Sequence, residues 1–158
     1  MNHEYKSEEK KRKIILENYN NPEKQVSLDE VENLSKEINT PYLTFKSFES
    51  GCGDIFHLLL EVGKEEKVVK RCIFSAKDSC LITISFANIV CLYFEGKKVV
   101  ELKEILEDCF KMIENKEYSS NLRNYPNLEI FNDIYKFPHR IECAKIVLRA
   151  FDSFLKIY

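Results

Sequence analysis

The sequence lacks the patterns that mark several large classes of protein. Its 24 Lys+Arg are balanced by 26 Asp+Glu, so it has no broad basic excess of the kind that electrostatic binding to nucleic acid uses. No apolar run approaches the roughly 18 uninterrupted residues of a membrane-spanning helix. Residues 1–13 are almost all polar or charged and hold no apolar core of a signal peptide. We therefore expect a soluble, cytoplasmic protein with neither a nucleic-acid nor a membrane partner.

Several functional motifs are also absent. The chain contains no Cys-x-x-Cys pair, no His-Glu-x-x-His, no glycine-rich phosphate loop and no nucleophile elbow. Conventional zinc-finger, nucleotide-binding and hydrolase interpretations therefore have no support. There is no internal repeat, and 158 residues of which 44% are hydrophobic suit one compact domain. We expect a single domain over residues 1–158, with a polar tail at 1–7.

The order of apolar patterns predicts strands flanked by helices. Three runs rich in aromatic and β-branched residues are separated by short glycine-containing segments, which suits an antiparallel meander. Helical spacing or a long apolar run marks the other segments, and a weakly amphipathic stretch is either a linker or a short surface helix. The expected strands are YLTFKSF, IFHLLLEV and KVVKRCIF, the expected helices span 7–19, 80–94, 99–115 and 138–155, and the weak stretch is LDEVENLSKEI.

Six cysteines are present, and in a reducing compartment they are more plausibly free, metal-bound or catalytic than paired in disulfides. Cys72, Cys91 and Cys109 lie inside apolar periodic runs, so we assign them to the core. Cys80 and Cys143 fall at or near predicted helix starts, where the helix dipole favours a thiolate. The alternative for Cys80, which borders an apolar run, is a small buried hydrophobe.

The segment Gly51-Cys52-Gly53-Asp54 places two potential ligands two residues apart. In an extended chain such side chains point the same way, and the flanking glycines allow a tight turn. Taken alone the motif is weak, because a Gly-Cys-Gly turn with an Asp is more often simply a turn.

Two histidines are weaker candidates. His57 lies within an apolar run and is expected to be an ordinary strand residue. His139 follows Pro138 near Cys143, so it either lines the same cleft or is merely exposed at a helix start.

Taken in order, four short segments resemble the NifU/IscU/SufU family of iron-sulfur cluster assembly proteins. The first resembles the family's N-terminal helix ending in Tyr-x-Asn-Pro, the second its Cys-Gly-Asp, the third the cysteine that opens its apolar helix, and the fourth its Phe-Pro-x-Arg-x-x-Cys-Ala. In this chain they are ILENYNNP (15–22), Cys52-Gly53-Asp54, Cys80 and FPHRIECA (137–144).

The resemblance implies a fold and a ligand set. The fold is α+β, a three-stranded antiparallel sheet packed against helices, in agreement with the apolar patterns above. Cys52, Asp54, Cys80 and Cys143 would converge on one metal ion. Three thiolates and a carboxylate suit a closed tetrahedral zinc site.

Two features resemble the SufU branch more than the scaffold branch. The scaffold proteins have a histidine directly before the last cysteine, where this chain has Glu142, and the segment 116–135 is similar to an extra stretch of the SufU type. The resemblance thus implies a zinc-bound sulfur acceptor. It would take persulfide sulfur on Cys52 from a SufS-like cysteine desulfurase and hand it to downstream iron-sulfur assembly components. Arg140 would help to dock the partner or steady a sulfur anion.

Two other functions stay open at this point. The same four residues would suit a scaffold that holds a transient iron-sulfur cluster through Cys52, Cys80 and Cys143. The chain could instead be a drifted, non-catalytic binding module that keeps the fold. Whether it is a transferase enzyme is left undecided by the sequence.

Overall fold

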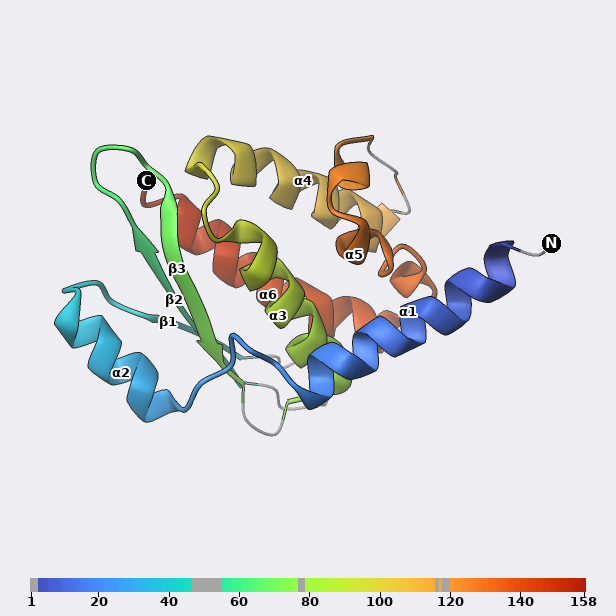
Figure 1. Cartoon of the computed structure of the whole chain (residues 1–158), viewed down its shortest axis with the longest axis horizontal. Coiled ribbons are helices and arrows are strands. Elements are labelled where there is room, and N and C mark those ends of the chain that lie inside the picture. The colour runs from blue at the N-terminus through green and yellow to red at the C-terminus, as the bar shows by residue number, and fades with distance from the viewer. Residues whose placement is uncertain (1–2, 47–54, 77–78, 116, 118–119) are drawn as a thin grey trace.

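The computed structural model describes residues 3–46, 55–76, 79–115, 117 and 120–158, and these form an α+β structure (Figure 1). Three strands and six α-helices occur in the described part, with short 3-10 helices at Ser120–Asn124 and Ile134–Lys136. The elements are α1 His3–Asn20, α2 Leu28–Glu37, β1 Leu43–Lys46, β2 Ile55–Val62, β3 Val69–Ser75, α3 Leu81–Phe94, α4 Val99–Asn115, α5 Pro126–Glu129 and α6 Pro138–Leu155.

The strands form an antiparallel meander in the order β1-β2-β3, as the sequence predicted. Leu43 pairs with Leu58 across β1 and β2, and Leu58 pairs with Phe74 across β2 and β3. The outer edge of β3 is covered by the segment that follows α1: the amide of Val26 donates to the carbonyl of Phe74, and the amide of Phe74 donates to Lys24. This pairing leaves β3 without a free edge along that stretch.

Helices cover both faces of the sheet. Figure 1 shows α2 on one side of the strands and α3, α4 and α6 on the other. Helix α2 packs against β2 and β3, while α6 packs against β1 and β2. Successive side chains of a strand point to opposite faces, so burial on both sides makes Leu58, Leu59 and Leu60 all inaccessible.

Helix α3 is the central helix of the structure. It contacts α1, α6, α5 and β3, which explains why its sequence is apolar on every side rather than amphipathic. One buried polar residue, Asn88, ties it to the N-terminal segment: its amide donates to the Asn18 side chain at 2.7 Å, and its oxygen accepts from the Lys24 amide at 2.9 Å. The middle of α3 is thereby joined to the last turns of α1 and to the segment that follows it.

Several predicted boundaries are confirmed and two are refined. Helix α4 spans the predicted residues 99–115, and α6 begins at Pro138 as expected. The stretch LDEVENLSKEI, for which the sequence allows a linker or a short surface helix, forms helix α2, whose first turn is capped by the Ser27 hydroxyl. Helix α1 begins at His3, within the residues expected to be a polar tail. Of the helices in the described part, none is long and apolar enough to cross a membrane.

Candidate metal and sulfur site

Cys80 is the N-cap residue of α3, as its predicted position at a helix start required. Its backbone is extended (φ −72°, ψ 164°), and its sulfur accepts a hydrogen bond from the Thr83 amide at 3.5 Å. The first amides of a helix have no partner within the helix and carry partial positive charge. A sulfur that faces them is stabilised when it bears negative charge, which is the state in which cysteine binds a metal.

Thr83 connects this cap to the last helix. Its hydroxyl lies 3.4 Å from the Cys80 sulfur and donates a hydrogen bond of 3.2 Å to the carbonyl oxygen of Cys143. Thr83 is fully buried. The structure thus brings Cys80 and Cys143, which are 63 residues apart in the sequence, to the same place between α3 and α6.

Cys143 lies deeper in its helix than the sequence suggested. It is the sixth residue of α6, which begins at Pro138, and it is only 3% exposed. The helix-dipole argument applies to the first turn and therefore holds for Cys80 but not for Cys143. The predicted helix start at Pro138 is confirmed, but Cys143 lies five residues beyond it, in the second turn of α6.

Cys52 and Asp54, the other two predicted ligands, lie outside the described residues. Among the described residues, no group of three or more His, Cys, Asp or Glu is arranged to hold a metal ion. That part of the chain contains only two of the four predicted ligands, so the four-residue set stays a prediction.

A buried hydroxyl beside Cys80 fits a bound polar group. Ser79 is 6% exposed, and its side-chain oxygen finds no hydrogen-bond partner in the structure as described. Leaving a buried hydroxyl unpaired costs about 1–3 kcal/mol. A Cys80 thiolate, the form in which this residue would bind a metal, would accept a hydrogen bond from such a hydroxyl, so the residues present are compatible with a zinc site.

The residues around Cys143 on α6 differ in their exposure. Arg140 is exposed and lies with its guanidinium carbon 4.6 Å from the centre of the Phe137 ring. His139 is exposed at the helix start, the second of the two possibilities left open for it. Glu142 is ion-paired on its own helix, with Lys145 at 3.9 Å and Arg149 at 3.6 Å.

His57 is a strand residue, as expected. Its Nδ1 lies 2.8 Å from the Thr44 hydroxyl, and its ring meets the Tyr42 ring edge to face. Burial lowers the pKa of His57. The contacts with Thr44 and Tyr42 explain the position of the His57 side chain, and no metal ion is needed to explain it.

The three cysteines assigned to the core are all buried, which confirms that prediction. The Cys72 thiol donates to the Cys91 sulfur at 2.8 Å. Burial raises the pKa of Cys72, and the Cys91 hydrogen bond and the nearby Glu95 charge raise it further. Burial raises the pKa of Cys109 to about 12, with a smaller contribution from Asp108. Such thiols are poor nucleophiles and poor metal ligands at neutral pH.

Sequence reasoning missed the role of Thr83. The signal was available in the spacing Cys80-x-x-Thr83, which is the spacing between an N-cap residue and the third residue of its helix. The contact between Thr83 and Cys143 had no such signal, because it depends on how α3 packs against α6.

A known protein resembles the chain in sequence along most of its length. The chain is 24% identical over 145 residues to the zinc-dependent sulfurtransferase SufU of Bacillus subtilis (strain 168), covering 90% of this chain and 86% of that protein. No family model matches the chain.

Solved structures resemble it along most of its length. A NifU-like protein (N-terminal) from Brucella abortus superimposes with a TM-score of 0.71 at 16% identity, covering 91% of this chain and 90% of that one. A protein described as a SUF-system iron-sulfur cluster assembly scaffold, from Fervidobacterium islandicum AW-1, gives 0.70 at 17% identity, covering 89% and 92%. The chain is therefore similar to SufU in sequence, and its fold is that of the NifU-like and SufU proteins.

Proposed function

We propose that this chain is a cytoplasmic, single-domain iron-sulfur cluster assembly protein of the SufU type. It accepts persulfide sulfur from a cysteine desulfurase on Cys52 and passes it to a downstream component. The observation that carries the proposal is the pair Cys80 and Cys143, which Thr83 holds together between α3 and α6. These are two of the ligands expected from the resemblance, and the relative of similar length is a zinc-dependent sulfurtransferase.

The donor chemistry supports zinc as the resident metal. Cys52, Asp54, Cys80 and Cys143 would hold it, and three sulfurs with one carboxylate match the ligand preferences of zinc. When bound, zinc would keep the thiols deprotonated and fix the ligand-bearing segments in place. The contact of Cys80 with the Thr83 amide prepares that sulfur for this state.

Cys52 is the proposed sulfur acceptor because of its neighbours in the sequence. It stands between Gly51 and Gly53, which impose the least restriction on backbone movement. Cys80 and Cys143 are instead fixed by an N-cap contact and by burial within α6. A thiol that meets a bulky partner must be able to move, and this favours Cys52.

The transfer balances without an external oxidant. Cys52 would have to be free of the metal to react, and its thiolate then attacks the terminal sulfur of the desulfurase persulfide, so that a new sulfur-sulfur bond forms on Cys52. The old sulfur-sulfur bond breaks, and its electron pair goes to the desulfurase cysteine, which takes up a proton. Arg140, exposed at the start of α6, is proposed to steady the sulfur anion or the partner during this step.

A second candidate has support from the relatives. One structural neighbour is described as a cluster assembly scaffold, and the same cysteines would suit a transient iron-sulfur cluster. Glu142 occupies the position where the scaffold branch has a histidine, and it is ion-paired to Lys145 and Arg149 rather than directed to a cysteine. This difference favours sulfur transfer.

The test is to map the added sulfur. The protein is mixed with a matching cysteine desulfurase and cysteine, trapped with an alkylating reagent and analysed by mass spectrometry. We expect one additional sulfur on Cys52, none on Cys52→Ala, and normal transfer to Cys109→Ala, whose altered cysteine is buried in α4. Sulfur mapped to Cys80 or Cys143, with Cys52 unmodified, would overturn the assignment. No added sulfur on any cysteine would favour the non-catalytic binding module.

A further inference from the structure

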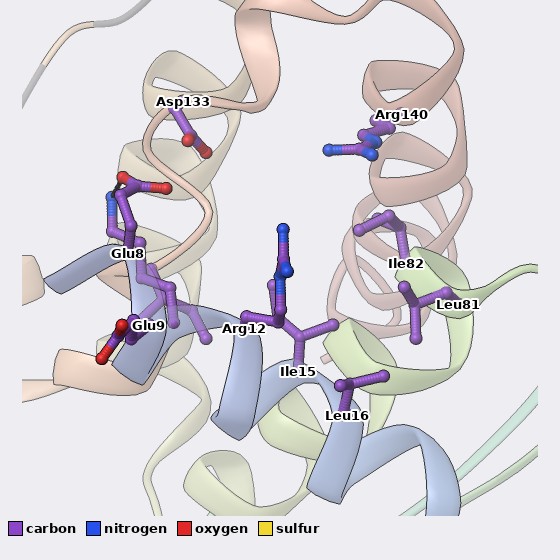
Figure 2. A pocket seen from close by; sticks show the side chains of 11 residues that line it. Glu8, Glu9, Arg12, Ile15, Leu16, Leu81, Ile82, Asp133 and Arg140 are labelled. Atoms are coloured by element: carbon purple, nitrogen blue, oxygen red, sulfur yellow. Dashed lines mark hydrogen bonds and ion pairs between the residues drawn. The ribbon is translucent and has the colours of Figure 1, made fainter. Parts of the chain in front are cut away.

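A pocket of about 530 Å³ opens beside the start of α3. Its walls come from α1, the start of α3, the segment that follows α5 and the start of α6 (Figure 2). Leu81 and Ile82 form part of the wall and directly follow Cys80 in the chain. The volume lies in the range of small-molecule sites, about 300–1,000 Å³.

Two guanidinium groups from distant parts of the sequence point into this pocket. Figure 2 shows Arg12 of α1 rising from its floor and Arg140 of α6 reaching in from the opposite wall. Within the described residues, neither guanidinium makes an ion pair with a carboxylate. Two like charges that share a pocket repel each other, and an anion between them removes the repulsion and forms charge-assisted hydrogen bonds.

The opposite side of the pocket carries negative charge. The Asp133 carboxylate faces the cavity in Figure 2 and has no ion-pair partner among the residues described. Glu8 on the same side is already paired with Lys11 at 3.4 Å. Glu9 also lines the pocket without an ion pair to any described residue, but its carboxylate points away from the two arginines in Figure 2. Within the described part of the chain, Asp133 is therefore the carboxylate without an ion pair that faces both arginines across the cavity.

The floor between the charged walls is apolar. Ile15 and Leu16 of α1 meet Leu81 and Ile82 of α3 there. Leu16 remains 42% exposed, although it faces a cavity in which an apolar group would cover it. A ligand that matches all three walls has a carboxylate, a cation and a short apolar body.

We propose that this pocket binds a free α-amino acid with a short apolar or thiol side chain. The carboxylate lies between Arg12 and Arg140, the ammonium group faces Asp133, and the side chain covers the apolar floor. A simple anion would leave Asp133 uncompensated, and a simple amine would leave the two arginines uncompensated. The proposal goes beyond the sulfur-acceptor function and does not depend on it.

The test compares three probes of similar size. L-2-aminobutyrate carries both charges and an ethyl group shaped like the cysteine side chain but without sulfur, while butyrate has only the carboxylate and butylamine only the ammonium. Each is titrated into the full-length protein, with binding followed by methyl NMR of Ile15, Leu16 and Ile82. We expect saturable shifts of these methyl groups with 2-aminobutyrate, and binding at least tenfold weaker for the other two.

Variants separate the two charged walls. The double variant Arg12→Gln/Arg140→Gln is expected to weaken 2-aminobutyrate at least tenfold, and Asp133→Asn is expected to bring its affinity close to that of butyrate. Arg71→Gln is the matched control, because Arg71 lies on β3 and pairs with Glu61 at 3.7 Å, away from the pocket. Thermal unfolding of each variant shows whether it is folded.

Three results would overturn the proposal. They are equal binding of butyrate and 2-aminobutyrate, undiminished binding by the double arginine variant, and the absence of saturable shifts at any of the three residues. Amino acids also chelate zinc, so the metal content is measured after each titration, and binding that merely removes metal counts against the pocket. Sulfur mapping on Cys52 is a separate readout, so the failure of either proposal leaves the other standing.

Discussion

The hydroxyl of Thr83 donates a 3.2 Å hydrogen bond to the carbonyl oxygen of Cys143, and this joins the first turn of α3 to the second turn of α6. The same hydroxyl lies 3.4 Å from the sulfur of Cys80. One buried side chain thus positions both described candidate ligands, although it has no direct part in the proposed chemistry.

Replacing Thr83 by Val tests this connection. Val keeps the shape of Thr but cannot donate a hydrogen bond, so we expect a loss of about 1 kcal/mol in the free energy of unfolding. We also expect a measurably lower affinity for zinc. The matched control is Ser85→Ala, since the Ser85 hydroxyl is also buried on α3 but bonds only to Ile82 of its own helix. Equal metal affinity in the two variants, measured by chelator competition, would show that Thr83 does not organise the site.

Replacing Cys143 by Ala should empty the metal site and lower the melting temperature, because a structural metal site couples ligand loss to folding. The control is Cys109→Ala, which removes a thiol of similar burial from α4. We expect the control to lose about 1–2 kcal/mol of stability while keeping its zinc. Full zinc content and unchanged stability in Cys143→Ala would disprove the ligand assignment.

The buried thiol of Cys109 predicts a specific alkaline destabilisation. Burial raises its pKa from 9.0 to about 12, so above pH 9 the unfolded chain ionises this thiol before the folded protein does. Its contribution is complete below pH 9 and is lost as pH rises toward 12, at about 1.4 kcal/mol per pH unit. Denaturant unfolding at about pH 8 and pH 10.5 should show that the wild type loses about 2 kcal/mol more than Cys109→Ala. Equal losses would contradict the buried, neutral thiol.

The core cysteines should resist chemical labelling in the folded protein. Cys72, Cys91 and Cys109 are each at most 1% exposed, and a buried neutral thiol reacts slowly with alkylating reagents. Peptide mapping after a brief exposure to iodoacetamide should therefore find these three unmodified, and modified only after unfolding in denaturant. Rapid labelling of any one of them in native conditions would place it outside the core.

The sequence predicted most of the fold because its local signals agree with the tertiary structure. Pro138 marks the start of α6, and the three apolar runs coincide with three strands. Helix α2 was harder to predict, because its short apolar face is buried only by packing on the sheet, through Val31 and Leu34. Whether such a short helix forms is hard to predict, because tertiary contacts rather than intrinsic helix propensity stabilise it.

The candidate site could be predicted only in part. Cys80 was recognisable as a helix cap, because a cap depends on residues close together in the sequence. The position of Cys143 in the second turn of α6 follows from the predicted helix start at Pro138. Its contact with Thr83 depends on how two helices pack, which no local pattern records. The pocket between Arg12 and Arg140 was invisible for the same reason, since it joins residues from opposite ends of the chain.

We propose that the protein holds zinc in a closed site and serves as a sulfur acceptor. The most direct measurement is the metal, iron and labile sulfide content per chain of native protein purified without oxygen, together with its visible spectrum. We expect about one zinc per chain, no stoichiometric iron or sulfide, and a colourless solution. A brown protein with iron and sulfide would contradict it in favour of a cluster scaffold, and metal-free protein with ordinary thiol reactivity would contradict it in favour of a binding module.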